Sequence, residues 1–319
     1  MAETGHGPAC RKYYEEYKDV RLAGCCDIDE EKAETFKTSF GFEKHYTDYI
    51  KMLDEIKPDV VCLVASVQFT KELAISIIKK GYNIILEKPP GLNREELSEM
   101  LETAKKSKVY VRTAFNRRYT PLVLELKKHL KNKKIFNITY QMYRNNRRES
   151  FFETTASHAI DVAKNIAGSD YKKVDIIYQE CPELGEKVAN YYLNCEFENG
   201  AYGQLSLVTN GGTIVERATV NTLDETYFLE LPFWGNIDDP GRLRGIKNGK
   251  DMFLDINGKD IVDSDEQFET GGFYEENRSF FEQIRENKGV TCDLETGIQT
   301  VDLINCLANR ITEYKKIKN

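Results

Sequence analysis

Residues Gly81 to Gly91 read GYNIILEKPPG, and this stretch decides the fold of the first part of the chain. The continuous apolar run within it predicts a buried strand over Asn83–Leu86. Gly81 ends an amphipathic helix predicted over Lys71–Lys80. Lys88 therefore follows the end of a strand, and ligands of open α/β sheets bind beyond the carboxyl ends of strands. A lysine there can act as a general acid or an electrostatic stabiliser, although a surface lysine in a proline-rich turn fits the spacing equally well.

Strands and helices alternate on both sides of this stretch as far as residue 115. The predicted strands are 20–26, 60–64, 83–86 and 109–114, and the predicted helices are 9–17, 30–40, 49–56, 71–80 and 93–106. Asn93 followed by Glu96 is a helix-start signal. Such alternation indicates βαβ units and a parallel sheet.

The pattern changes near Asn116, where strands begin to follow one another directly. The predicted strands are 136–143, 174–178, 188–197, 201–207 and 217–222, and the predicted helices are 120–130, 158–167, 274–285 and 296–314. Asn199-Gly200 is a hairpin signal. We therefore predict an α/β domain over residues 1–115 and an α+β domain with a mostly antiparallel sheet over residues 116–319.

Composition and charge exclude several classes of function. The chain has 319 residues, a net charge of −7 and a pI near 5.4, which disfavours nucleic acid or anionic membranes as partners. No apolar run is long enough to span a membrane, and no signal peptide is recognisable. The eight cysteines lack zinc spacing, so we expect no metal and reduced thiols in a cytoplasmic protein.

Two N-terminal features could bind a dinucleotide. Gly5, His6 and Gly7 precede a predicted helix, and glycines there let backbone N–H groups approach a pyrophosphate. Asp27 ends a predicted strand about twenty residues later, where a carboxylate can bond a ribose 2′-hydroxyl. A carboxylate repels a 2′-phosphate, so NAD is favoured over NADP. Ordinary loop glycines and a helix-capping Asp27 are the alternative interpretations.

His158 is one of only four histidines and is predicted to open a helix. Asp161, one turn later on the same face, could orient the imidazole for acid–base chemistry. A capping role for His158 explains the pattern equally well. Arg117, Tyr119 and Arg144 belong to polar clusters that could bind carboxylate, phosphate or sugar hydroxyls, although such clusters are usually solvated surface.

Together these segments resemble the Gfo/Idh/MocA family of NAD(P)-dependent oxidoreductases over nearly the whole chain. The most specific similarity is GYNIILEKP at 81–89, which matches the family's G-x-x-V-x-x-E-K-P segment. The other similarities are, in chain order, DVVCLV at 59–64, AFNRRYTP at 114–121, HAID at 158–161 with Gly168 after it, FYEENRSFF at 273–281 and DLE at 293–295.

The resemblance implies a Rossmann domain followed by a domain with an open, mostly antiparallel sheet, and a cofactor between them. It implies that Lys88 contacts the reacting hydroxyl, that Lys88–Pro89 is a cis peptide and that His158 is the acid–base group. The implied cofactor-binding residues are Gly5, His6, Gly7, Asp27, Ala65, Ser66, Glu87, Lys88 and Asn116. The implied substrate-binding residues are Arg117, Tyr119, Arg144 and Asp161.

The sequence departs from the family pattern in three places. Only Met1–Thr4 precede Gly5, so we expect the central first strand of the family to be missing, through truncation or through a sheet that closes differently. Glu3 and Pro8 occupy two of the three positions of the glycine fingerprint. Thr154 stands where members often carry Asp, and Ala65-Ser66-Val67 replaces the usual Thr-Pro-Asn.

The leading hypothesis is a homo-oligomeric dehydrogenase that transfers a hydride between NAD and a hydroxyl or carbonyl of a sugar, cyclitol or sugar acid. One alternative is a non-catalytic binding protein on the same fold with a degraded cofactor site. Another is an NAD-dependent glycosidase.

Overall fold

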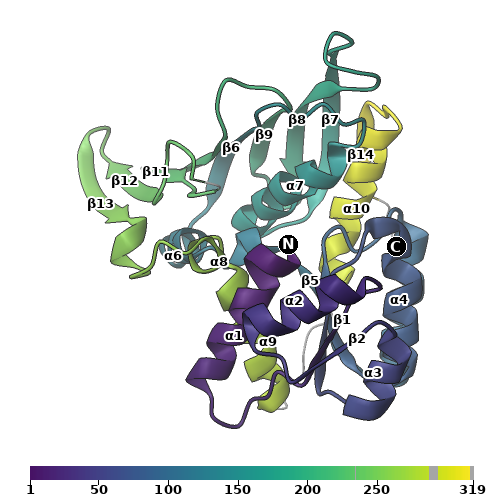
Figure 1. Cartoon of the computed structure of the whole chain (residues 1–319). Helices are drawn as coiled ribbons and strands as arrows, with labels where there is room; N and C mark the ends of the chain where they lie inside the picture. The colour runs from purple at the N-terminus through teal and green to yellow at the C-terminus, as the bar shows by residue number, and fades with distance from the viewer. Residues whose placement is uncertain (234, 287–293, 317–319) are drawn as a thin grey trace.

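The computed structural model describes residues 1–233, 235–286 and 294–316. Asp293, the first residue of the DLE stretch, lies outside these ranges. The chain forms two layers of structure, an α/β part at the bottom of Figure 1 and a broad sheet with flanking helices at the top. Within the described ranges, no helix has both the length and the apolar character needed to cross a membrane.

The α/β part contains five short strands and six helical segments. The strands are β1 (Gly24–Cys26), β2 (Lys44–Tyr46), β3 (Val60–Leu63), β4 (Asn83–Glu87) and β5 (Val111–Ala114). The helical segments are η1 (Ala2–His6), α1 (Gly7–Glu16), α2 (Glu30–Phe40), α3 (Tyr49–Ile56), α4 (Val67–Lys79) and α5 (Arg94–Ser107). Asn93 accepts a hydrogen bond from the Glu96 backbone N–H, which confirms the predicted start of α5.

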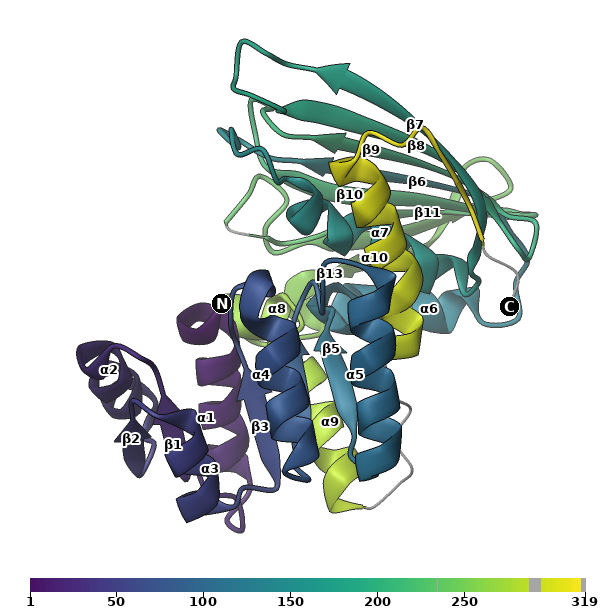
Figure 2. The same cartoon turned by 90° about the vertical axis from the view of Figure 1, so that its right-hand side faces the viewer.

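The parallel strands form two separate sheets. β1 pairs with β2, and β3, β4 and β5 form a second sheet in that order. All four residues of β3 are only half-buried, whereas Ile84–Glu87 of β4 and all of β5 are buried. Among the described residues β1–β2 is thus set apart from β3–β5 (Figure 2).

The first helix begins earlier than the sequence predicts. Helical structure starts at Ala2 and continues through Gly7 into α1, so Gly5 and Gly7 stand in helical turns instead of a loop. A Cβ on Gly5 would lie 2.7 Å from the ring of Phe273, and one on Gly7 would lie 2.8 Å from the ring of Phe40. Both glycines are therefore required by close packing.

The second part is a nine-stranded mixed sheet with the order β13-β12-β11-β10-β6-β9-β8-β7-β14. Its strands are β6 (Ile135–Tyr143), β7 (Tyr171–Glu180), β8 (Ala189–Phe197), β9 (Tyr202–Val208), β10 (Val215–Thr222), β11 (Glu225–Glu230), β12 (Arg242–Lys247), β13 (Asp251–Asn257) and β14 (Glu313–Lys315). Only β6 and β9 pair in parallel, so the predicted mostly antiparallel sheet is confirmed. Gly200 forms the predicted turn between β8 and β9 with a φ of 85°.

The helical segments of the second part are η2 (Asn116–Tyr119), α6 (Pro121–Leu130), α7 (Glu153–Ala167), η3 (Gly258–Asp260), α8 (Gln267–Thr270), α9 (Phe273–Arg285) and α10 (Leu294–Ala308). Of these, α6, α7 and α10 contact the nine-stranded sheet. α7 and α10 lie beneath the sheet, and α9 returns to pack against α1 and β5 (Figures 1 and 2). The predicted boundary at residue 115 falls between β5 and η2 and stays a prediction.

Two helix predictions are wrong in detail. α7 begins at Glu153, so His158 lies inside the helix instead of opening it. The last helix ends at Ala308, and β14 follows as an edge strand paired with β7. The apolar pattern at 296–314 runs through both elements, because Tyr314 is also buried although it belongs to a strand.

Candidate active site

Lys88 follows β4 in a turn with a cis Lys88–Pro89 peptide, as the resemblance implies. Its ammonium donates a hydrogen bond to the Thr154 carbonyl at 3.4 Å, which brings β4 to the first turn of α7. Burial lowers the pKa of Lys88 to about 8, and the positive charges of Arg117, Arg147 and Arg144 act in the same direction against the opposing Glu87. An ammonium with this pKa changes its charge just above neutral pH.

His158 lies one turn after Thr154 on α7, and helical residues four apart share a face. Its side chain is buried, and its Nδ1 atom has no hydrogen-bond partner. Burial holds the pKa of His158 well below its usual value, and the charges of Arg117, Lys88 and Arg144 add to the effect. The imidazole is therefore neutral near pH 7 and can accept a proton.

A buried ion-pair network stands beside this pair. The Glu216 carboxylate of β10 accepts hydrogen bonds from Arg117 at 2.8 Å, from Arg144 and from the Tyr140 hydroxyl at 2.9 Å. Although burial opposes ionisation, the two guanidinium groups lower the pKa of Glu216 to about 2. The network fixes two positive charges that disfavour protonation of His158.

Asp161 does not orient His158, contrary to the sequence-based expectation. Its carboxylate accepts hydrogen bonds from Arg118, one of them at 2.7 Å, and from Thr300 at 3.5 Å. Arg118 reaches it from η2, an element that sequence spacing cannot place beside α7. The ion pair fixes the junction between α7 and η2.

The polar residues of η2 are engaged in structure. Asn116 is fully buried, donates to the Gly271 carbonyl at 2.8 Å and accepts from Arg117 at 3.1 Å. Tyr119 is half-buried, and the Arg112 guanidinium lies 5.4 Å from its ring centroid. The roles predicted for Asn116 and Tyr119 in ligand binding stay predictions.

A second polar cluster adjoins Lys88 from the other side. His6 Nδ1 lies 3.1 Å from Asn277 Oδ1, and His6 Nε2 lies 3.4 Å from Glu87 Oε1. Burial disfavours the imidazolium, but the Glu87 carboxylate outweighs it and raises the pKa of His6 to about 9. Glu276 is fully buried without a hydrogen-bond partner for either oxygen, and burial raises its pKa to about 8.

The remaining predicted cofactor residues lie at the carboxyl ends of β1 and β3. Asp27 follows β1 and is exposed, and its Oδ1 accepts a hydrogen bond from the Asp29 backbone N–H at 2.9 Å. Ala65 and Ser66 follow β3, and Ser66 precedes α4 without a side-chain capping bond. Ala65 and Ser66 share the carboxyl edge of the β3–β5 sheet with Lys88, where parallel-sheet proteins bind ligands, whereas Asp27 ends a strand of the other sheet.

The residues near Lys88 fit the nicotinamide half of a dinucleotide, and Asp27 fits a ribose of the other half. His158 Nδ1 is buried near Lys88 without a hydrogen-bond partner, as expected where a polar ligand completes the site. Asp27 offers an exposed carboxylate to a ribose. The helical Gly5–Gly7 segment, in contrast, does not form the phosphate-binding loop that the sequence suggests.

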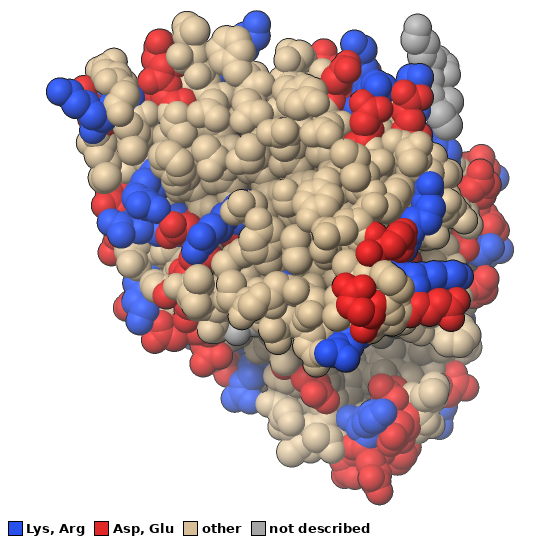
Figure 3. Space-filling view, turned by 90° about the horizontal axis from the view of Figure 1, so that it is seen from above, with Lys and Arg blue, Asp and Glu red and all other residues tan. Residues whose placement is uncertain are grey.

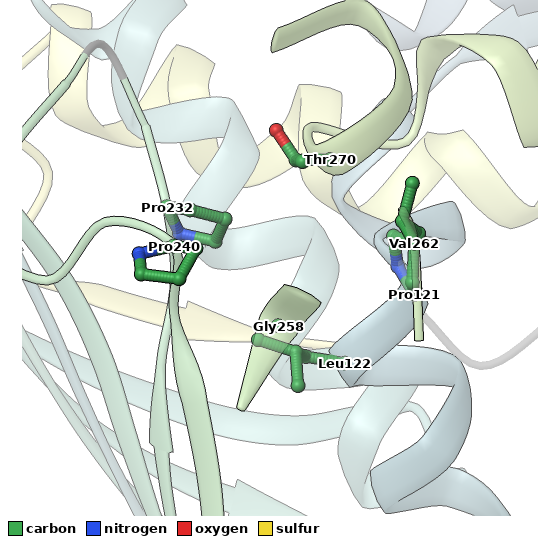
Figure 4. A pocket seen from close by; sticks show the side chains of 7 residues that line it. All are labelled: Pro121, Leu122, Pro232, Pro240, Gly258, Val262 and Thr270. Atoms are coloured by element: carbon green, nitrogen blue, oxygen red, sulfur yellow. The ribbon is translucent and has the colours of Figure 1, made fainter. Parts of the chain in front are cut away.

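Two other kinds of site find no support. Among the residues that the structure describes, no three side chains of His, Cys, Asp or Glu are grouped so that they could bind a metal ion. A shallow hollow between α6 and the β11–β12 loop is lined mainly by prolines and aliphatic groups (Figure 4). Neither Lys88 nor His158 lines it.

The sequence analysis assigned no individual role to several residues of the site. These are Glu216, Arg147, Glu276 and Asn277, and only Glu216 lies outside every motif and cluster found in the sequence. The sequence pattern could have indicated that Glu216 is buried. Alternate residues of a strand face the same side of the sheet, and Glu216 shares its side with the buried Ala218 and Val220. Glu276 and Asn277 belong to the FYEENRSFF stretch, where neither was assigned a role.

The α/β part of the chain matches a known protein family. Residues 5–115 match the family described as oxidoreductases with an NAD-binding Rossmann fold. The matched family is Gfo/Idh/MocA, and the match is confined to this part of the chain. The family resemblance and the predicted fold class are thereby confirmed.

Curated relatives of this Gfo/Idh/MocA segment are named dehydrogenases. Myo-inositol 2-dehydrogenase of Thermotoga maritima is 31% identical over 114 residues, which are 36% of this chain and 34% of that protein. Glucose-6-phosphate 3-dehydrogenase of Bacillus subtilis is 33% identical over 122 residues, which are 38% of this chain and 34% of that protein. The aligned segment spans about a third of the length of each relative.

Solved structures share the fold over the whole chain. A levoglucosan dehydrogenase in complex with NADH and levoglucosan superposes with a TM-score of 0.82 at 18% identity, covering 100% of this chain and 97% of that one. A probable dehydrogenase from Thermotoga maritima gives a TM-score of 0.77 at 20% identity, covering 97% and 96%. At these identities the likeness establishes the fold alone.

Proposed function

We propose that the protein is an NAD-dependent dehydrogenase that interconverts a hydroxyl and a carbonyl group of a sugar, cyclitol or sugar acid. The observation that carries the proposal is the approach of the Lys88 ammonium to the α7 turn that carries a neutral, buried His158. Bound NAD would accept the hydride. Asp27, Ser66, Glu87 and Lys88 are the residues we assign to holding the dinucleotide.

The two catalytic side chains have complementary charges near pH 7. Neutral His158 removes the hydroxyl proton, and Lys88 stabilises the negative charge that develops on the oxygen. Tyr119 is the proposed substrate contact. Arg117 and Arg144 would have to leave Glu216 to bind a ligand, and Asp161 would have to leave Arg118, so we assign all three to positioning.

The direct test is incubation of the full chain with NAD and a panel of sugars, cyclitols and sugar acids, with NADH absorbance as the readout. Calorimetric titration with NAD in parallel measures binding without turnover. We expect NAD binding and NADH formation with at least one panel member. Absence of NAD binding would refute the proposal.

A non-catalytic binding protein is the second candidate, because Gly5 and Gly7 are packed in a helix and the sheet is divided. This candidate predicts substrate binding without NAD binding. Calorimetry with the panel alone therefore separates the two functions.

Replacing Asp27 by alanine is expected to weaken NAD binding by roughly tenfold to a hundredfold, because a hydrogen bond to a charged group contributes about 1.5–3 kcal/mol. NADP binding should weaken less, since the repulsion of its 2′-phosphate is relieved. Calorimetric Kd values for both cofactors check this. Asp54→Ala, which removes an exposed carboxylate paired with Lys80, is the control and should leave both values unchanged.

The pH profile of hydroxyl oxidation should fall above pH 8. Lys88 is charged below its pKa of about 8 and loses its charge above it, so kcat/KM should decline there by about tenfold per pH unit. His158 stays neutral down to pH values well below 6.5. Lys88→Arg keeps the charge at high pH and should move this decline upward, and an unmoved decline would assign it to another group.

The open face of the nine-stranded sheet is the proposed dimer interface. Asn194, Gln204, Thr139 and Thr219 lie in register across β8, β9, β6 and β10, and none carries a charge. Figure 3 shows charged side chains mainly around the rim of this face. A stable interface buries more than about 1,000 Å², which so broad a sheet can supply.

Sedimentation is expected to show a dimer that Thr139→Arg converts to a monomer, because the substitution places a charge at the centre of this face. Lys172→Glu, at the exposed edge, serves as control. A monomeric wild type at micromolar concentration would contradict the interface.

A further inference from the structure

Cys10 and Cys62 bring two thiols together from distant parts of the chain. Cys10 lies on α1 and Cys62 on β3, and their Sγ atoms are 3.9 Å apart. All seven described cysteines are free thiols. A disulfide has an S–S distance of about 2.0 Å, so a side-chain shift of about 2 Å would join this pair.

The two thiols have unlike surroundings. His6 lies one helical turn before Cys10, and its imidazolium is held beside Glu87. The contact with Cys62 and the His6 charge lower the pKa of Cys10 and outweigh the opposite effect of its burial. The contact with Cys10 and burial raise the pKa of Cys62. Cys10 is therefore the better nucleophile, and Cys62 is placed to react second.

The neighbouring cysteines lack these features. Cys25 directs its thiol to the carbonyls of Ala33 and Lys44, and burial raises its pKa to about 11. Burial also raises the pKa of Cys26 to about 11, with Asp27 adding to the effect. Both thiols remain protonated at neutral pH and react slowly with oxidants.

We infer that Cys10 and Cys62 form a reversible disulfide, an oxidative modification site beside the Glu87–Lys88 turn. With hydrogen peroxide, the Cys10 thiolate attacks one oxygen, the O–O bond breaks, and hydroxide leaves and gains a proton as water. The resulting sulfenic acid is attacked by Cys62, whose proton leaves with the hydroxyl group as a second water. Two thiols are oxidised and one peroxide is reduced to two waters.

The bond would tie α1 to β3 at the divided sheet. Cys62 pairs in register with Ile85 of β4, two residues before Glu87, and α1 continues from the segment that carries His6. Oxidation would thus fix the position of His6 relative to the Glu87–Lys88 turn. The modification does not depend on which substrate the protein takes.

The test treats the full chain with an equimolar amount of hydrogen peroxide, blocks remaining thiols with an alkylating reagent, and maps peptides by mass spectrometry. We expect a cross-linked peptide pair containing Cys10 and Cys62, lighter by two hydrogen atoms and restored to free thiols by dithiothreitol. Wild-type protein alone decides this result, so the test does not depend on folding of a variant.

Single cysteine variants test whether Cys10 reacts with peroxide before Cys62 does. Cys62→Ser should leave Cys10 as a sulfenic acid that dimedone traps, and Cys10→Ser should remove dimedone labelling at both positions. Cys26→Ser, a matched change in the same part of the fold, should leave the cross-link unchanged. Oxidation of Cys26 or Cys25 while Cys10 and Cys62 stay fully alkylated would overturn the inference, as would a Cys10 disulfide to any other cysteine.

Discussion

Lys88→Met is expected to lower kcat/KM for hydroxyl oxidation by about a hundredfold to ten-thousandfold, the range for loss of one charge-stabilising or proton-transfer group. Methionine keeps much of the length of the lysine chain but removes the charge beside Thr154. His158→Asn should cause a loss of similar size, because it removes the proton acceptor. The double variant should lose little more than either single one, since groups that act as a unit are not additive.

The measurement is initial NADH formation at saturating NAD, with melting temperatures taken alongside. Lys71→Met removes a lysine paired with Glu99 on the exposed face of α4 and should retain full activity. If Lys88→Met and His158→Asn both keep wild-type rates while folded, the assignment of these two residues is wrong even if the protein oxidises sugars.

Glu216→Gln is expected to destabilise the fold by about 3–5 kcal/mol, the loss found when one partner of a buried ion pair is removed. The neutral amide would leave the Arg117 and Arg144 guanidinium groups without a buried counter-charge. Urea unfolding followed by fluorescence measures the change. Glu230→Gln breaks a half-exposed pair with Arg244 and should cost no more than about 1 kcal/mol.

The contribution of the Glu216 carboxylate to the stability of the fold depends on pH. Its pKa of about 2 in the folded protein lies below the unfolded value of 4.5, so its stabilisation is complete above pH 4.5 and is lost as pH falls toward 2. The difference in stability between wild type and Glu216→Gln should therefore shrink across this range. A difference that stays constant with pH would contradict the ion-pair explanation.

Local pattern predicts the strand and turn around Lys88 because each signal lies within a few residues. The continuous apolar run defines β4, and Gly81 marks the end of the preceding helix region. The same reasoning places His158 on a helix but starts that helix too late, because Phe152 provides no side-chain cap to mark the beginning.

Partners that meet only through tertiary structure lie beyond such reasoning. Asp161 shares a helix face with His158, yet Arg118 from η2 binds it with two hydrogen bonds. Gly5 reads as a phosphate-loop glycine, yet the Phe273 ring, distant in sequence, accounts for its lack of a side chain. In both cases a residue far along the chain decides a role that short-range spacing leaves open.

The division of the parallel strands has a consequence for local stability. β1 and β2 pair over only three residues each, and a two-stranded sheet of that size is marginal without support. The segment from Leu22 to Ile56 is thus expected to open as a cooperative unit at lower free energy than β3–β5, with faster amide hydrogen exchange. Asp27 belongs to this weaker unit and Lys88 to the stronger one. A ligand that contacts both would bind the closed form preferentially and so slow the exchange of the whole segment.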